Sequence, residues 1–284
     1  MTKELIIFKS EGDGNVDNTA LARFISSIGS LNGYGSSLLQ TKHALDLNSS
    51  TPLNQDSDDV AIFEDALKGI TAVRRVGFSV DGIIAINKAF DSDSDEEPNW
   101  PGHLRNAYYN EDDRIGIILD EKSHRTYMPP EVVGRNDLQK IVDEYMTSPK
   151  KEKDAWRVFV RIAKLQPFQD GNKRTALIAA NAAYDTFSRE NYLVLPFDEL
   201  DQTDFMTTLM RYYETDNQDE EEKYFNRLLS LLPSDRERIL HKPISPDDGS
   251  GKTITFNLKP QIRNRSGKKP KITRKIDLKT QKHD

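Results

Sequence analysis

Residues 165–175 read LQPFQDGNKRT, and this short stretch decides how the rest of the chain is interpreted. It joins two segments whose apolar residues recur at helical spacing, so both segments are predicted to be buried helices. The upstream helix is marked by Trp156, Phe159, Val160 and Ala163, and the downstream helix by Ala176, Leu177, Ala179, Ala180, Ala183, Tyr184 and Phe187. The stretch is therefore predicted to link two core helices.

This linker has the features of a phosphate-binding loop. Gly171 and Asn172 accept a positive φ and leave backbone N–H groups at the start of a helix, where the helix dipole favours an anion. Lys173 and Arg174 add positive charge, and Asp170 can hold Mg²⁺ against phosphate oxygens. An ordinary helix entry can also carry a Gly-Asn turn followed by two cations. The order and the close spacing favour a site for a polyphosphate and its metal.

The same stretch resembles the signature of the Fic/Doc (Fido) family, His-x-Phe-x-(Asp/Glu)-(Gly/Ala)-Asn-(Gly/Lys)-Arg. Six residues fall in register with it, namely Phe168, Asp170, Gly171, Asn172, Lys173 and Arg174. The resemblance implies a mainly α fold, a Fic-type helical bundle with a short β-hairpin flap. It also implies that the loop binds ATP or another nucleoside triphosphate together with Mg. By this resemblance Asp170 binds the metal, the other five residues bind the nucleotide, and Arg174 also acts in catalysis.

One position departs from the signature. Where the family has a histidine that takes the proton from the target hydroxyl, this chain has Gln166. A carboxamide has no basic nitrogen near neutral pH, and losing a positioned general base typically costs ~10²–10⁴ in rate. Gln166, at the catalytic position, can still orient a hydroxyl or bind a phosphate oxygen. Among the histidines, only His124 is considered as a substitute base.

A second departure concerns the transferred group. The family's transferases often carry another arginine three residues after the first, where this chain has Leu177. The Doc-like subset, which has lysine where this chain has Lys173, also lacks that arginine and is associated with transfer of a terminal phosphoryl group rather than AMP. In many Fic proteins a glutamate on an inhibitory helix pairs with that second arginine. The stretch from Ser27 to Asn32 has the spacing of this helix motif, but Leu31 stands at the position of the glutamate. Both the glutamate and the arginine of this inhibitory pair are therefore expected to be absent.

Residues 115–130 predict a β-hairpin that ends at two prolines. A plain surface hairpin has the same pattern. The resemblance instead implies the flap, preceded by the family's Pro-Gly-x-x-Arg segment at 101–105, whose edge binds an extended piece of a protein target by strand addition. The target-docking residues would then be Ile117, Ile118, Leu119, Thr126, Tyr127 and Met128.

The rest of the apolar pattern predicts further helices on both sides of the loop. They are expected at about 16–28, 60–70, 80–90 with Ser79 as N-cap, 138–146, 205–212 and 224–232, with a strand at 5–8 and loops at 46–59 and 91–97. We therefore divide the chain into an N-terminal helical extension at 1–59, a Fic-like core at 60–232 and a basic C-terminal tail at 233–284. The tail is expected to hold a small strand or to be partly disordered.

Charge is distributed unevenly along the chain. From Pro243 onward eleven Lys and Arg face four Asp and Glu, a net charge of +7, which leaves −13 for the first 242 residues because the whole chain carries −6. Such a tail can contact a polyanion or fold against its own acidic body. With Phe256 as its only aromatic residue, recognition of nucleic-acid bases is not indicated.

Composition excludes several classes of protein. The 284 residues contain no cysteine, so disulfides and thiolate metal sites are excluded, and a reducing cytoplasm is the expected location. The five histidines have no metal-binding spacing, which makes a zinc enzyme unexpected. No apolar run reaches the length of a membrane span, so no membrane partner is expected.

Three functions remain open from the sequence. The first is a Fic-like protein that binds a nucleoside triphosphate with Mg but transfers AMP or phosphate to a protein hydroxyl weakly or not at all. The second is an active protein adenylyltransferase or phosphotransferase that works without a histidine. The third is a non-catalytic interaction module that acts through the flap and the basic tail. We expect the first.

Overall fold

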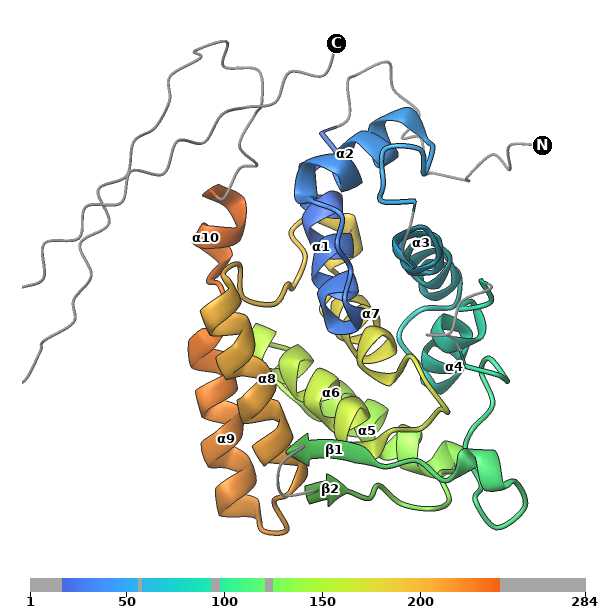
Figure 1. Ribbon diagram of the computed structural model, residues 1–284. Helices are drawn as coiled ribbons and strands as arrows, with labels where there is room; N and C mark the ends of the chain where they lie inside the picture. The colour runs from blue at the N-terminus through green and yellow to red at the C-terminus, as the bar shows by residue number, and fades with distance from the viewer. Residues whose placement is uncertain (1–16, 56–57, 93–97, 121–124, 241–284) are drawn as a thin grey trace, which may run out of the picture. The chain divides into compact units, whose positions relative to one another are not determined.

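The computed structural model describes residues 17–55, 58–92, 98–120 and 125–240, all within one of two contact units of the chain, 1–243. These residues form a mainly α fold with one small β-hairpin, as predicted (Figure 1). The helices are α1 (Thr19–Gly29), α2 (Leu38–Leu47), α3 (Asp59–Val76), α4 (Val80–Lys88), α5 (Arg135–Thr147), α6 (Glu152–Leu165), α7 (Asn172–Ala183), α8 (Glu199–Tyr213), α9 (Gln218–Leu231) and α10 (Asp235–Leu240). The strands are β1 (Ile117–Asp120) and β2 (Arg125–Tyr127), and the 3-10 turns are η1 (Ser30–Asn32), η2 (Glu111–Asp113) and η3 (Thr186–Ser188).

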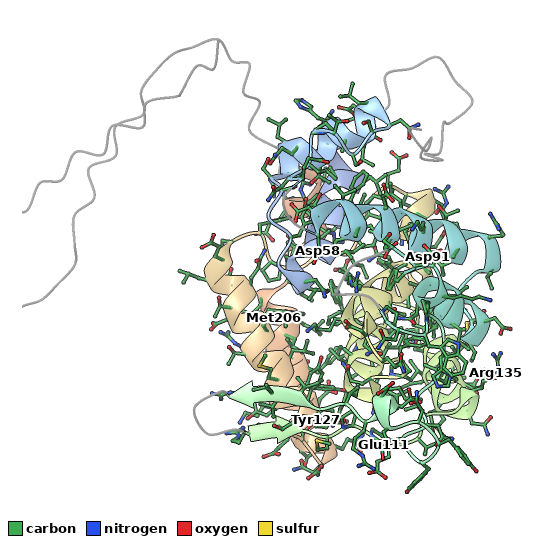
Figure 2. All side chains as sticks on the ribbon, turned by 45° about the vertical axis from the view of Figure 1, so that its right-hand side comes forward. Asp58, Asp91, Glu111, Tyr127, Arg135 and Met206 are labelled. Atoms are coloured by element: carbon green, nitrogen blue, oxygen red, sulfur yellow. The ribbon has the colours of Figure 1, made fainter. Side chains whose placement is uncertain are left out.

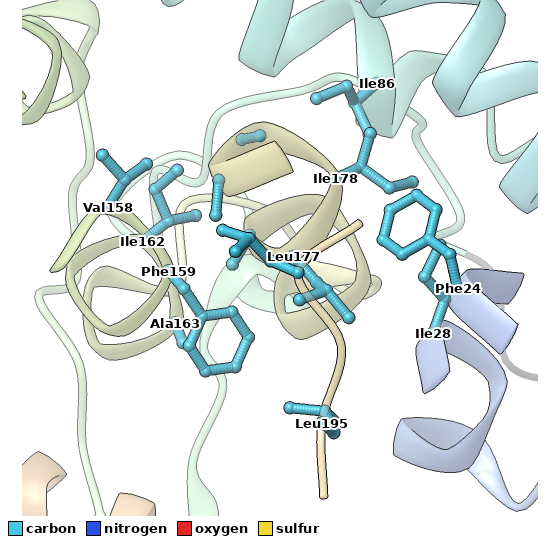
Figure 3. Packing of buried hydrophobic residues seen from close by; sticks show 14 of the residues in the cluster. Phe24, Ile28, Ile86, Val158, Phe159, Ile162, Ala163, Leu177, Ile178 and Leu195 are labelled. Carbon is cyan, nitrogen blue, oxygen red and sulfur yellow. The ribbon is translucent and has the colours of Figure 1, made fainter. Parts of the chain in front are cut away.

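Helix α7 is the centre of the core, and it packs against α6, α4, α3 and α1. Figure 3 shows Leu177 of α7 on the side of Ile162 from α6, and Ile178 on the side of Ile86 from α4 and Phe24 from α1. All five side chains are fully or almost fully buried. Burial of each large apolar side chain stabilises the fold by roughly 1.5–3 kcal/mol. The helix that follows the motif loop is therefore held firmly from several sides.

Helix boundaries differ from the predicted ones where local caps intervene. The predicted cap of α4 is confirmed, because Ser79 Oγ accepts a hydrogen bond from Gly82 N at 3.0 Å. This helix ends at Lys88, so Phe90, predicted to lie on it, follows its end. Likewise α7 ends at Ala183, and Asp185, at a φ of 53°, turns the chain into η3.

The helix α2 was not predicted. Few of its residues face the core, and the apolar pattern is correspondingly weak. Its start carries a local signal that could have revealed it, a capping box in which Ser37 Oγ accepts from Gln40 N and Gln40 Oε1 accepts from Ser37 N. The polar loop predicted at 46–59 starts after this helix and ends at Asp59, the first residue of α3.

The hairpin predicted at 115–130 is confirmed, with Ile117 opposite Tyr127 and Ile118 opposite Thr126 in an antiparallel register. Tyr127 holds it against the helices, since its hydroxyl donates to Lys164 O at 3.0 Å and its ring stacks on Tyr213 at 5.4 Å. Figure 2 shows Tyr127 and Glu111 of η2 at the same end of the molecule. The hairpin is thus attached beside the end of α6, where the motif loop begins.

Several sequence predictions fall outside the described residues. They are the strand at 5–8, His124, the acidic residues 93–97 and the tail beyond residue 240. The described part of the segment 233–284 includes α10, whose Arg238 is 5% exposed and donates to both carboxylate oxygens of Glu152 at 2.9 and 2.8 Å. Among the helices of the described ranges, none combines the length and the apolar character needed to cross a membrane.

Candidate functional site

The motif loop begins at Gln166, which ends α6 in the left-handed conformation (φ 49°, ψ 61°). Its side chain turns back on the helix, so that Nε2 donates to Ala163 O at 2.7 Å, and the residue is 7% exposed. A helix end leaves its last carbonyls without partners. In this conformation the carboxamide satisfies one of them, and one of its donors is therefore occupied by its own helix.

Arg105, from the Pro-Gly-x-x-Arg segment, fixes the start of the loop. Its Nε donates to Gln166 O at 2.6 Å, its Nη1 to Asp113 O at 2.8 Å and its Nη2 to Pro130 O at 3.0 Å. The side chain is 1% exposed, and burial lowers its pKa although Asp113 and Tyr127 act in the opposite direction. One planar cation thus joins the motif loop, η2 and the end of the hairpin.

Asn172 closes the loop from the other side. Its Oδ1 accepts from Phe168 N at 2.8 Å, and its Nδ2 donates to Phe168 O at 2.8 Å. Both residues are buried, so the amide satisfies a donor and an acceptor that have no access to water. The structure therefore uses Asn172 and Phe168, both predicted to bind nucleotide, to hold the shape of the loop.

Gly171 lets the loop pass close to α4. Its φ is 70°, and a Cβ at this position would lie 2.8 Å from the ring of Phe90. Asn87 of α4 fixes this approach, because its Nδ2 donates to Asp170 O at 2.9 Å and its Oδ1 accepts from Gly102 N at 2.8 Å. Only glycine satisfies both the left-handed backbone and the limited space.

The three charged residues of the loop differ in exposure. Asp170 and Lys173 are half-buried, whereas Arg174 is 1% exposed and its Cζ lies 4.9 Å from the centroid of the Phe90 ring. All three stand at the start of α7, where helix N–H groups and the dipole favour an anion. A phosphate that approaches from solvent therefore meets Asp170 and Lys173 before Arg174.

Asp170 is the carboxylate that the motif loop offers to a metal shared with phosphate. Asp170 supplies the carboxylate, and its Oδ1 also accepts from Gly171 N at 2.6 Å. No group of three or more His, Asp or Glu residues able to hold a metal exists in the described part of the chain. Magnesium bound here would take its remaining ligands from phosphate oxygens and water, as it commonly does.

A buried carboxylate, Asp113, connects the loop to the segment before the hairpin. Its oxygens interact with Asn106 N at 2.6 Å, His103 Nε2 at 2.9 Å and Gln169 Nε2 at 2.8 Å. Burial raises the pKa of this carboxyl, but the hydrogen bonds outweigh burial and hold the pKa below its usual value. His103 in turn stacks on Trp100, with ring centroids 4.1 Å apart. It is therefore a histidine linked to the motif loop that the sequence analysis did not select.

The flap residues divide between two faces. Ile117, Leu119 and Tyr127 are half-buried and pack against the core, whereas Ile118 and Met128 are 62% and 58% exposed. Thr126 is also exposed. Side chains of a strand alternate between faces, so this division follows directly from the register.

The sequence analysis missed the residues that hold the loop from outside, chiefly Asn87, Phe90 and Asp113. Asn87 could have been found, because it is a single amide on the apolar face of α4, next to Ile83 and Ile86. Asp113 lies in an acidic run with Glu111 and Asp112, and the sequence does not distinguish the buried acid from the exposed ones.

Comparison with known proteins agrees with this fold. Residues 77–184 match the sequence model of the Fic/DOC family, a range that includes the hairpin, the motif loop and α7. A Fic domain-containing signaling protein from Bacteroides thetaiotaomicron has a similar structure, with a TM-score of 0.56 and 14% sequence identity over 77% of this chain and 84% of that chain. At this identity the similarity concerns the fold. The comparison with curated proteins gave no match.

Residues 77–184 therefore form a Fic/DOC domain within this chain.

Proposed function

We propose that this Fic/DOC protein binds a nucleoside triphosphate with Mg at residues 166–174 and transfers AMP or phosphate weakly or not at all. One observation carries the proposal: the loop keeps the anion-binding residues of its family but has Gln166 at the position of the base. Asp170 would hold the metal, and Lys173 with the start of α7 would attract the phosphates.

The loss of turnover follows from proton chemistry. An attacking hydroxyl must give up its proton, and a carboxamide cannot accept it near neutral pH. Nε2 of Gln166 also donates to Ala163 O, so the side chain is already held by its own helix. Binding needs only charge and donors, and it therefore persists when the base is lost.

Calorimetry with the full chain tests the binding half of the proposal. We expect heat on titration with ATP in the presence of Mg²⁺, and weaker, less metal-dependent binding by Asp170→Asn. Asp112→Asn, an exposed acid in η2, serves as the matched control and is expected to bind like the parent. Absence of binding with ATP and with the other nucleoside triphosphates would contradict the proposal.

Restoring the histidine tests the catalytic half. Gln166→His is expected to raise transfer of label from ATP to protein by ~10²–10⁴ relative to the parent. Label at the α-phosphate and at the γ-phosphate, used separately, distinguishes AMP transfer from phosphoryl transfer. If the variant binds ATP and remains as inactive as the parent on a verified target, the histidine is not the missing element.

The burial of Arg174 favours a second function, an interaction module that acts through the hairpin without nucleotide. Arg174 is 1% exposed and lies over Phe90, so it contributes little to an anion site in this conformation. If the protein is such an interaction module, calorimetry shows no nucleotide binding, and Ile118→Ser or Met128→Ser weakens binding of a protein partner at the hairpin.

A further inference from the structure

A cavity of about 580 Å³ lies beyond the far end of α7 from the motif loop. It is lined by α1, by residues 189–194 and by α10, and Arg23 of α1 donates from Nη1 to Arg238 O of α10 at 2.7 Å. The motif loop precedes the first residue of the twelve-residue α7, and residues 189–194 follow its end. That helix is roughly 18 Å long, so the cavity is separate from the candidate nucleotide site.

Arg23 gives this cavity an unusual chemistry. The residue is 8% exposed, and its Nε and Nη2 are buried and have no hydrogen-bond partner in the described part of the chain. Buried donors in proteins are almost always paired, and those of a charged group most of all. Burial lowers the pKa of this guanidinium, although Asp17 opposes the effect. Arg23 therefore has two buried donors for which residues 17–55, 58–92, 98–120 and 125–240 supply no acceptor.

The two donors lie on one edge of the guanidinium group, and this edge matches a carboxylate. The same protein shows that pairing elsewhere, where Arg125 donates from Nε and Nη2 to the two carboxylate oxygens of Glu214. Such a bidentate pair is stronger and geometrically more specific than a single hydrogen bond. At Arg23 the described residues supply no such carboxylate to Nε and Nη2.

The other two arginines of the cavity are already occupied. Arg238 donates to both oxygens of Glu152 at 2.9 and 2.8 Å and to Asn191 Oδ1 at 3.2 Å. Arg189 stacks on the ring of Tyr184 with Cζ at 4.4 Å from its centroid, and it donates to backbone carbonyls. Arg23 also lies over a ring, with Cζ 5.5 Å from the centroid of Phe197, but its Nε and Nη2 have no hydrogen-bond partner among the described residues.

Charge balance selects the class of ligand. The lining also contains Asp17, Glu190 and Asp235, and Glu152 already neutralises Arg238. A doubly charged phosphate would meet these acids, whereas a single carboxylate is compensated by Arg23 alone. Apolar side chains, including Ala20, Tyr192 and Val194, line the remaining space. The volume lies within the range of small-molecule sites, about 300–1,000 Å³.

We propose that this cavity binds a small organic carboxylate with an apolar body, whose carboxylate pairs with Nε and Nη2 of Arg23. Both nitrogens are out of contact with solvent. Binding therefore requires Arg23 to turn its free edge toward the cavity that its side chain lines. The site is separate from the candidate nucleotide site and lies where α1 contacts α10 through Arg23 and Arg238.

Calorimetry with the full chain and a panel of probes tests the proposal. Phenylacetate is expected to bind, acetate to bind more weakly, and phenylacetamide and inorganic phosphate to give no binding. L-phenylalanine, which adds an ammonium group for the acidic lining, is the zwitterionic arm of the panel. Binding of phenylacetamide equal to that of phenylacetate, binding of phosphate alone, or no binding by any probe would overturn the proposal.

Variants locate the bound carboxylate. Arg23→Lys keeps the charge and removes the paired edge, and it is expected to weaken phenylacetate binding by about tenfold or more. Ala20→Phe fills the cavity without changing Arg23 and is expected to have a similar effect, with circular dichroism checking that both variants are folded. Arg125→Lys, whose arginine already has a carboxylate partner, is the matched control and should bind like the parent. Unchanged binding by both Arg23→Lys and Ala20→Phe would place the ligand elsewhere.

Discussion

The motif loop and the hairpin next to it are built in opposite ways. In the loop, Gln166 and Asn172 turn inward and bond backbone groups, so polar side chains hold the shape. In the hairpin one face packs on the core, while Ile118 and Met128 are exposed on the other face. The comparison teaches that internal hydrogen bonds hold the form of the loop, whereas the outer face of the hairpin is exposed. Mutations should therefore have large effects on stability in the loop and small ones on the hairpin.

The largest effect is expected for Arg105→Met. The carbonyls of buried Gln166 and Asp113 and of exposed Pro130 lose their donor, and the free energy of unfolding should fall by about 4 kcal/mol. Denaturant unfolding measures the change. Arg114→Met, at an exposed arginine of the same segment, is the matched control and should stay within about 0.5 kcal/mol of the parent. Equal losses of unfolding free energy in the two variants would contradict the proposed difference between the motif loop and the protein surface.

A smaller loss is expected for Asn172→Ala. The N–H and the carbonyl of Phe168 both remain buried without a partner, which should destabilise the protein by about 2–3 kcal/mol. The same unfolding experiment measures it, with Asn226→Ala on the exposed side of α9 as control. A loss no larger than that of the control would mean that the amide does not hold the loop.

The next effect depends on pH. Asp113 has a pKa below its ordinary value of 3.8, so the stability it supplies is present above that value and is lost as the pH falls through the lower folded-state pKa. Asp113→Asn should therefore be less stable than the parent by about 2 kcal/mol near neutral pH. The difference should shrink below about pH 3.8 when unfolding is followed across the acid range. A difference that stays constant with pH would exclude the charge of Asp113 as its source.

The smallest effects are expected on the hairpin. Tyr127→Phe removes the hydrogen bond to Lys164 O and should cost about 1 kcal/mol. Burial also raises the pKa of this tyrosine to about 12, so its hydroxyl remains a donor at neutral pH. Ile118→Thr on the open face should change the stability by less than about 0.5 kcal/mol. Thermal unfolding of both variants checks the order, and a larger loss for Ile118→Thr would show that the outer face is not free.

The long helices could be predicted because their buried faces repeat regularly, as in α3 and α6. The helix α2 could not, since its few buried residues leave almost no pattern and only the capping box at Ser37 marks it. The loop was predicted from residue types, which indicate charge and backbone freedom. Residue types do not show where side chains point, and so the sequence could not reveal that Asn172 bonds Phe168 or that Arg174 is buried. Nucleotide and metal binding by these residues stay predictions.

The guanidinium of Arg105 has a mechanical consequence. It bonds Pro130, three residues after the end of β2, and Gln166, where the motif loop begins, through a single rigid plane. Neither carbonyl can shift by much without stretching its own bond or pulling the other along. A displacement of Pro130 is therefore expected to reach residue 166 through this one side chain.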